Sequence, residues 1–232
     1  MSEINILSVD FDWIMEPSIN MYNDHIRGST TIDEILENNP GILVKPDIQK
    51  FYTLFTLINI ISRWIDNPNH FVIADNHQEI VDTINIKWDI QDKYTLYNID
   101  HHHDCGYDVK TLEDIDNQNV QCGNWVHWIK NLDKYIWINN KNSDTFITQE
   151  IFYAIPKYQM SYDINLIRNV KFDYLFLCLS PGWTPKEFWP LFDTISFNIK
   201  EVIIPKLLIS QEDFINANAI HRAGSPSDII PT

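Results

Sequence analysis

Residues Ile4–Asp12 read INILSVDFD, a run of apolar side chains that ends in two aspartates. Apolar residues occupy both faces of this stretch, which is typical of a strand buried in a parallel sheet. Other short apolar runs also end in polar clusters. They predict further strands at residues 70–74, 94–99, 135–138 and 173–179 and, as a sixth, at 201–209.

Helical patterns lie between these strands. Asp47–Asp66 has apolar residues at three- and four-residue spacing, and further helices are expected at Gln78–Trp88 and Gly123–Leu132. Strands that alternate with helices favour an α/β fold, with three α/β/α layers and a mainly parallel sheet. The chain has 232 residues and no repeat or linker. We therefore expect a single domain over residues 1–232, with a loose tail at about 224–232.

The composition narrows the class of partner. With 17 Lys+Arg against 32 Asp+Glu, the net charge is −15, which disfavours nucleic acid and anionic membranes as partners. It suits a cationic partner, although acidic residues also serve solubility. Three cysteines without a close pair, and an N-terminus without signal-peptide features, predict a cytoplasmic protein.

Polar side chains follow three of the predicted strands. Asp10 and Asp12 end the first, Asp75 and His77 follow the second, and Asp100–Asp104 (DHHHD) follows the third. In a parallel α/β sheet, ligands bind at the carboxyl ends of the strands. We therefore expect these segments to line a common site.

The spacing within these segments indicates which side chains converge. In an extended segment, residues two apart point to the same side, so Asp100, His102 and Asp104 share one side, as do Asp10 and Asp12. Each segment alone has a structural alternative. Asp10 and Asp12 could belong to an ordinary loop, His77 could cap a helix or lie in the core, and the histidines at 101–103 could lie in a solvated loop. Burying four carboxylates together without cations is prohibitive, however, so the combination favours a metal site.

Oxygen and imidazole ligands without thiolate indicate Mn²⁺, Fe²⁺ or Zn²⁺. Six ligands are too many for one catalytic ion that keeps an open position. They suit two ions about 3.5–4 Å apart, bridged by carboxylates. The sequence therefore predicts a dinuclear centre.

Three segments resemble motifs of the arginase/deacetylase superfamily. Asp100–Asp104 resembles its Asp-x-His-x-Asp motif, Ala74–Glu79 (ADNHQE) its histidine-bearing strand-end motif, and Ser8–Asp12 (SVDFD) its Ser-x-Asp-x-Asp motif. The last motif normally comes late in the chain and here comes first, which implies a circularly permuted, arginase-like fold. This order is most similar to that of the bacterial peptide arginases, which convert arginine to ornithine in ribosomally made precursor peptides.

The resemblance implies two Mn²⁺ ions and a set of ligands for each. One ion would be held by His77, Asp100, Asp104 and Asp10. The other would be held by Asp100, His102, Asp10 and Asp12. Asp100 and Asp10 would bridge the ions, and Asp104 would also orient the attacking hydroxide.

The resemblance also suggests catalytic and substrate-binding residues. Cys122–His127 (CGNWVH) is similar to an arginase segment whose histidine shuttles protons, so His127 is a candidate general acid, with His101 and His103 as alternatives. Asn124 shares a helix face with His127. The substrate-binding candidates are Glu16 or Glu79 as the carboxylate partner of a guanidinium, Asn124, and Trp125 and Trp183 as aromatic lining of the mouth.

Together these features predict a manganese-dependent peptide arginase that acts on an arginine-containing precursor peptide. One alternative is a deacetylase-like amidohydrolase of the same superfamily. Another is a peptide-binding module that kept the fold and lost catalysis. The sequence does not specify an oligomeric state.

Overall fold

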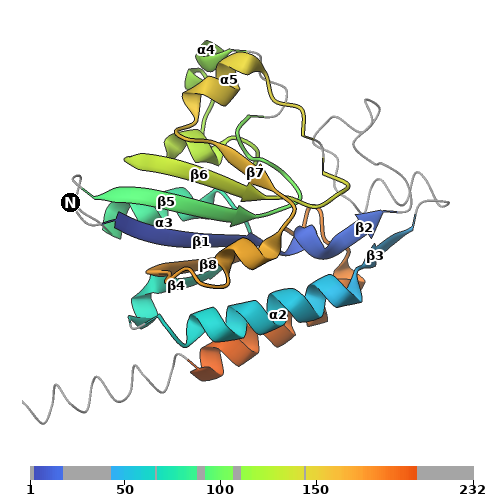
Figure 1. The fold of residues 1–232 in the computed structure, drawn as a ribbon. Helices are drawn as coiled ribbons and strands as arrows, with labels where there is room; N and C mark the ends of the chain where they lie inside the picture. Colours follow the sequence, from blue (N-terminus) through green and yellow to red (C-terminus); the bar gives the residue numbers. More distant parts are fainter. Residues whose placement is uncertain are drawn as a thin grey trace, which may run out of the picture.

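A six-stranded parallel sheet forms the centre of the computed structural model, which describes residues 3–17, 43–65, 67–87, 92–106, 111–143 and 145–202 (Figure 1). Every recorded pairing in this sheet is parallel, which confirms the predicted α/β class. From one edge to the other the strands are β4 (Phe71–Ala74), β8 (Tyr174–Cys178), β1 (Glu3–Asp10), β5 (Lys93–Ile99), β6 (Leu132–Ile138) and β7 (Gln159–Ser161).

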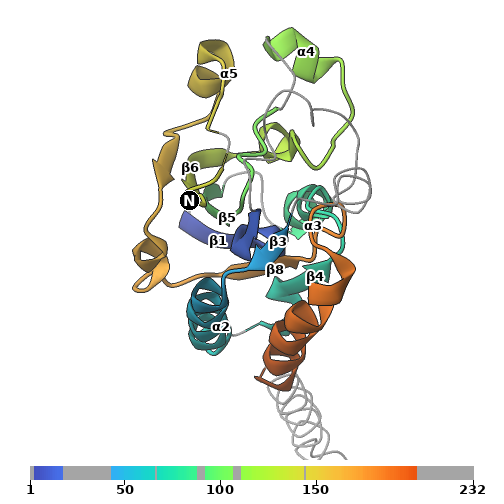
Figure 2. The same ribbon diagram turned by 90° about the vertical axis from the view of Figure 1, so that its right-hand side faces the viewer.

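Helices cover both faces of the sheet, as a three-layer α/β/α arrangement requires. On one face lie α2 (Ile48–Ser62) and a helical stretch at residues 189–202, whose side chains share one apolar cluster with β1 and β8. The second apolar cluster contains residues of α3 (Glu79–Lys87), α4 (Leu112–Asp116) and α5 (Gln149–Ala154). Figure 2 shows this layering along the strands.

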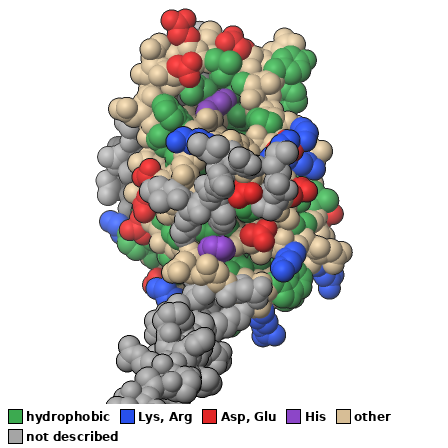
Figure 3. All heavy atoms as spheres, turned by 90° about the vertical axis from the view of Figure 1, so that its left-hand side faces the viewer, with side chains coloured by type: hydrophobic (Ala, Val, Ile, Leu, Met, Phe, Trp, Pro, Cys, Tyr) green, Lys and Arg blue, Asp and Glu red, His purple; other side chains and the backbone are tan. Residues whose placement is uncertain are grey.

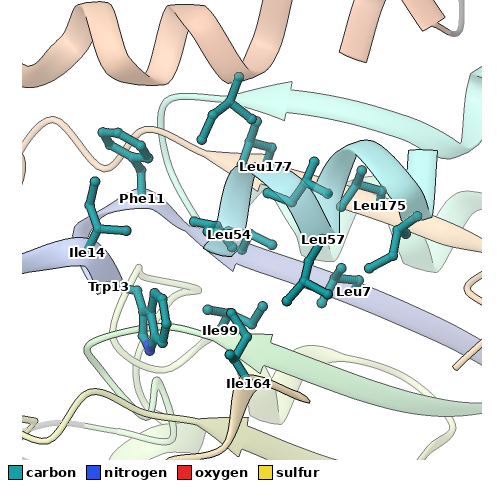
Figure 4. Packing of buried hydrophobic residues seen from close by; sticks show 14 of the residues in the cluster. Leu7, Phe11, Trp13, Ile14, Leu54, Leu57, Ile99, Ile164, Leu175 and Leu177 are labelled. Atoms are coloured by element: carbon teal, nitrogen blue, oxygen red, sulfur yellow. The ribbon is translucent and has the colours of Figure 1, made fainter. Parts of the chain in front are cut away.

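Helix α2 begins at a well-defined cap and buries one face. The Asp47 carboxylate accepts hydrogen bonds from the backbone N–H groups of Gln49 and Lys50, as an N-cap residue does. Leu54 and Leu57 of α2 are buried against β1 and β8, as Figure 4 shows. This face of the sheet therefore packs against a layer of buried apolar side chains.

The strand register brings the carboxyl ends of the central strands to one level. Val9 of β1 pairs with Ile99 of β5, so the next residue of each strand, Asp10 and Asp100, emerges beside the other. Asp10 also pairs with Cys178 of β8, and Ala74 of β4 pairs with the same cysteine. All three polar segments therefore begin at the same edge of the sheet.

Some sequence predictions are wrong in detail. The helix expected at Gly123–Leu132 is only a 3-10 turn at Trp125–Trp128, because Asn131 takes a left-handed backbone (φ 58°) and β6 follows at once. The strand expected at residues 201–209 is also wrong at its start, since 201–202 are helical. The rest of that range and the predicted tail at 224–232 lie outside the described residues.

Short strands escaped the sequence patterns. They are the edge strand β7 and a separate antiparallel pair, β2 (Met15–Pro17) with β3 (Val44–Pro46). At three residues each, these strands are too short to show a periodicity. The β2–β3 pair projects beyond the carboxyl edge of the sheet (Figure 1).

None of the helices in the described ranges has the length and apolar character needed to cross a bilayer. On the face at the amino ends of the strands, acidic and basic side chains are interspersed (Figure 3). The negative charge of the chain therefore does not form a single acidic patch on that face.

Candidate metal centre

Asp10 and Asp12 lie where β1 passes into a 3-10 turn (Phe11–Ile14). Asp10 ends the strand with extended backbone, and its Oδ1 accepts a hydrogen bond from the backbone N–H of Asp12 at 3.2 Å. Both carboxylates are buried. The turn therefore holds two negative groups side by side at the carboxyl edge of the sheet.

His77 reaches this pair from β4, although β8 lies between β4 and β1 in the sheet. Its ring stacks on Phe176 of β8, with centroids 5.7 Å apart and ring planes nearly parallel. Its Nδ1 lies 3.2 Å from Asp10 Oδ2, 3.1 Å from Asp100 Oδ2 and 3.2 Å from Asp104 Oδ2. One imidazole nitrogen thus faces three carboxylate oxygens.

The segment after β5 supplies the remaining candidate ligands. His102 Nδ1 lies 3.0 Å from Asp12 Oδ2 and 3.7 Å from Asp100 Oδ1, and the His102 backbone N–H donates to Asp100 Oδ1 at 2.8 Å. Asp104 has a left-handed backbone (φ 52°), which is costly for a residue with a Cβ. Strain of this kind is concentrated at functional sites.

Five of these six residues form two overlapping groups, and Asp104 contacts the first of them through His77. The ligand atoms of Asp10, His77 and Asp100 lie within 4.8 Å of one another, as do those of Asp12, Asp100 and His102. Each group could hold a metal ion, and Asp100 belongs to both. Comparison with protein-family models, curated proteins and solved structures finds no match. The assignment of this centre therefore depends on its own geometry.

The spacing of the atoms fits metal ligands. Ligands at right angles around an ion, with bonds of about 2.0–2.2 Å, lie about 3 Å apart. The separations of 3.1–3.2 Å around His77 Nδ1 match this value. Among the described residues, the ion-pair partners of the four aspartates are His77 and His102. Two imidazoles cannot balance four buried carboxylates, so the donor set fits divalent cations.

The pKa values of the cluster reflect the excess of carboxylates over imidazoles. Burial, together with the charge of a neighbouring aspartate, raises the pKa of Asp12 to about 7. Burial and the Asp100 charge raise the pKa of Asp104 well above its ordinary value. Burial lowers the pKa of His77 and of His102, but the facing aspartates outweigh it and raise both. Cations that bind here have to displace these protons.

Asp100 differs from the other carboxylates. Burial opposes its charged form, but hydrogen bonds from His102 and His77 lower its pKa below the ordinary range. Asn98 adds a further donor, with its Nδ2 3.1 Å from Asp100 Oδ2. Asp100 is thus held as an anion between the two groups, which suits a ligand that serves both.

Three hydrogen-bond partners of the ligands were not assigned from the sequence. Ser8 Oγ lies 2.5 Å from His77 Nε2, Asn98 contacts Asp100, and the Trp125 indole N–H donates to Asp104 Oδ2 at 2.5 Å. Ser8 and Asn98 each stand two residues before an aspartate of the site, on the same side of a strand, so the strand period contained this signal. Partners of this kind orient ligands and tune metal affinity.

Glu79 and Glu16, the two carboxylates predicted to bind a guanidinium, each contact other groups of the protein. Glu79 Oε1 accepts from the backbone N–H of Asn76 at 3.2 Å, where it caps the start of α3. Glu16 Oε1 lies 2.9 Å from Lys50 Nζ and 3.3 Å from Lys141 Nζ. No recorded contact among the described residues joins either carboxylate to the six ligands.

Asn124 and Trp125 have structural contacts. The Asn124 amide donates to the Gln118 side chain and the Asn119 carbonyl, both at 3.1 Å, which fixes the loop before the 3-10 turn. Trp125, predicted to line the mouth of the site, is fully buried. Its indole N–H donates to Asp104 and thereby orients that carboxylate.

His127 and His103 both face backbone carbonyls. His127 Nε2 lies 2.9 Å from the Cys105 carbonyl oxygen, and burial lowers the pKa of this histidine. His103 Nε2 lies 3.0 Å from the Phe146 carbonyl oxygen. These contacts hold the two rings beside the cluster of aspartates rather than within it.

His101 and Trp183 lie beside His102. His101 is buried, and burial and the His102 charge lower its pKa to about 3. The partly buried Trp183 has its ring centroid 4.8 Å from that of His102. Trp183 is therefore the predicted aromatic that lies at the edge of the centre.

Proposed function

We propose that this protein is a dinuclear manganese hydrolase that converts arginine side chains of a ribosomally synthesised precursor peptide to ornithine, with release of urea. The observation that carries the proposal is the convergence of four aspartates and two histidines in one buried cluster, five of them in the two overlapping groups and Asp104 in contact with His77. The resemblance of the sequence to the arginase/deacetylase superfamily implies the same six residues as ligands, which supports the proposal. It also supports an arginase-like fold with circularly permuted connections.

The proposed ligand sets follow the two groups. His77, Asp10, Asp100 and Asp104 would hold one ion, because His77 Nδ1 faces all three carboxylates at 3.1–3.2 Å. The second ion would take Asp12, His102 and Asp100, with Asp10 as a further bridge. The membership of Asp100 in both groups supports its role as a bridging ligand.

The chemistry requires a water-derived nucleophile and a leaving amine. When bound, two divalent cations supply hydroxide at neutral pH and stabilise the charge that develops during attack. Water adds to the guanidinium carbon, the bond from that carbon to the ornithine nitrogen breaks, and urea leaves.

Residues of the chain orient these partners. Trp125 donates to Asp104 Oδ2, which fixes the carboxylate proposed to align the nucleophile. The departing amine needs a proton from a group within hydrogen-bond reach. For His127 to provide it, the ring has to leave the Cys105 carbonyl, where Nε2 lies at 2.9 Å.

The test is a mass measurement on modified peptide. The protein is incubated with Mn²⁺ and an arginine-containing precursor peptide, and each converted arginine should lose the mass of urea less water. The His102→Ala variant, which lacks a ligand, should leave the peptide unchanged. A matched Lys157→Ala variant, changed at an exposed lysine that pairs with Asp133, should convert it fully.

Other outcomes separate the alternatives. Unchanged arginine in every peptide, together with hydrolysis of an acetyl-lysine peptide, would replace this proposal by a deacetylase-like amidohydrolase. Peptide binding without any change in mass would indicate a module that has lost catalysis.

A further inference from the structure

A hollow lies beside the metal centre, at the carboxyl end of β6. Its volume is about 280 Å³, and its walls come from the turn after β1, the first turns of α2 and the loop after β6. Trp13, Lys50, Asn139 and Lys141 are among its lining residues. The six proposed metal ligands do not line it, so it is distinct from the metal centre.

Two buried polar groups that line this hollow have no partner within the described part of the chain. The Asn139 side chain is 1% exposed, and neither its Oδ1 nor its Nδ2 forms a hydrogen bond there. The indole N–H of Trp13, a residue 3% exposed, has no acceptor either. Burying such groups unsatisfied is costly, which indicates that a ligand completes them.

The neighbouring asparagine shows a contrasting role. Asn140 Nδ2 donates to the carbonyl oxygens of Trp13 and Met15 at 2.8 and 3.3 Å, and its Oδ1 accepts from the Asn142 backbone. The polar atoms of the Asn140 side chain are therefore engaged in hydrogen bonds with the backbone around the hollow. Asn139, one residue earlier, is left to recognise a ligand.

The rim carries positive charge in a chain that is otherwise acidic. Lys50 and Lys141 both approach the same oxygen of Glu16, so two ammonium groups share one carboxylate. Lys50 also lies over the Trp13 ring, 5.5 Å from its centroid. Together with the Asn139 amide and the indole N–H, donors outnumber acceptors, which favours a carboxylate ligand.

The hollow is close enough to the metal centre for one peptide to occupy both. Trp13 directly follows the proposed ligand Asp12, and Ile138 pairs with Ile99, the residue before Asp100. Because neighbouring strands lie about 4.8 Å apart, the ends of β6 and β1 are roughly 10 Å apart. An extended chain covers this distance in about three residues.

We propose that this hollow binds a carboxylate of the substrate peptide, an Asp or Glu side chain within about three residues of the target arginine. This proposal rests on the proposed function, because it takes the metal centre as the position of the arginine. It adds a specificity determinant: the enzyme selects arginines that have an acidic neighbour.

Binding and turnover are measured with arginine peptides that carry Glu, Gln or Ala at each of the three positions on either side. The wild-type protein should bind the best-placed Glu peptide at least about tenfold more tightly than its Gln and Ala counterparts, because it gains charge-assisted hydrogen bonds. This preference should shrink severalfold in Asn139→Ala and in Lys141→Ala, the second of which alters an exposed side chain and spares the core. Lys157→Ala should keep it in full.

The outcomes discriminate between the proposals. Equal affinity of the wild-type protein for Glu, Gln and Ala peptides at every position would overturn the carboxylate site. Displacement of the Glu peptide by an equal concentration of free acetyl-glutamate would assign the hollow to a small carboxylate instead of a peptide. A Glu preference that depends on Asn139 and Lys141, without conversion of arginine in any peptide, would support the hollow and refute the proposed function.

Discussion

Replacing Ser8 by alanine tests whether His77 is a metal ligand. Ser8 Oγ lies 2.5 Å from His77 Nε2, while His77 Nδ1 faces three carboxylate oxygens at 3.1–3.2 Å. If Nδ1 binds the ion, Nε2 carries the proton and donates it to Ser8. The hydroxyl therefore accepts from Nε2 when Nδ1 binds the ion, and it holds the orientation of the ring.

Loss of such a partner typically weakens metal binding by about 10- to 100-fold, and we expect Ser8→Ala to raise the Kd for Mn²⁺ by that factor. Competition with a fluorescent chelator at fixed pH measures it. Ser62→Ala is a matched control, because Ser62 is also buried but bonds to the Asn59 carbonyl within α2, away from the centre. A Kd for Ser8→Ala within twofold of the wild-type value would refute the assignment of His77.

Further predictions concern the support of the site, its protons and the core. Trp125→Phe keeps the buried ring but removes the N–H that binds Asp104, and should lower manganese affinity about tenfold in the same assay. Without metal, the raised pKa values of Asp12 (to about 7) and His77 mean that the folded state holds protons that the unfolded state releases. Its melting temperature should therefore fall as pH rises from 5 to 8, and saturating Mn²⁺ should remove this slope; a metal-free protein that becomes more stable over this range would contradict the assignment. Leu54→Ala empties a fully buried position between α2 and the sheet and should cost about 2–5 kcal/mol in urea unfolding, while metal binding by the remaining folded protein stays unchanged.

Much of the fold could be predicted because its strands have a strong local signal. The apolar residues on both faces of Ile4–Asp12 and the apolar runs ending at Ala74 and Ile99 locate β1, β4 and β5 correctly. The order of strands in the sheet depends on contacts distant in sequence. Nothing in the local pattern of Tyr174–Cys178 indicates that β8 inserts between β4 and β1, so that His77 has to cross it.

The site shows the same division between local and distant information. The two-residue spacing of Asp10, Asp12, Asp100, His102 and Asp104 predicted that these side chains converge. The extended backbone assumed for that prediction does not continue past the strands, because Asp12 lies in a 3-10 turn and Asp104 has a left-handed backbone. The sequence contained no comparable spacing from which the substrate-binding residues could be predicted.

The positions of Glu16 and Trp125 illustrate why the contacts of these residues could not be predicted from the sequence. Glu16 lies near the metal motif in sequence, but Lys50 and Lys141, from two other segments, approach its carboxylate. The apolar ring of Trp125 suggested a contact with substrate. The structure instead places that residue beneath Asp104, because a buried indole needs an acceptor for its N–H.

The proposed function depends on the binding of two metal ions by the buried aspartates and histidines. Counting manganese by elemental analysis, after the protein has been loaded and freed of excess metal, tests it most directly. We predict two manganese ions per wild-type chain and clearly fewer in Asp10→Ala and His102→Ala. A wild-type chain that retains no manganese, or variants that retain the full wild-type content, would contradict it.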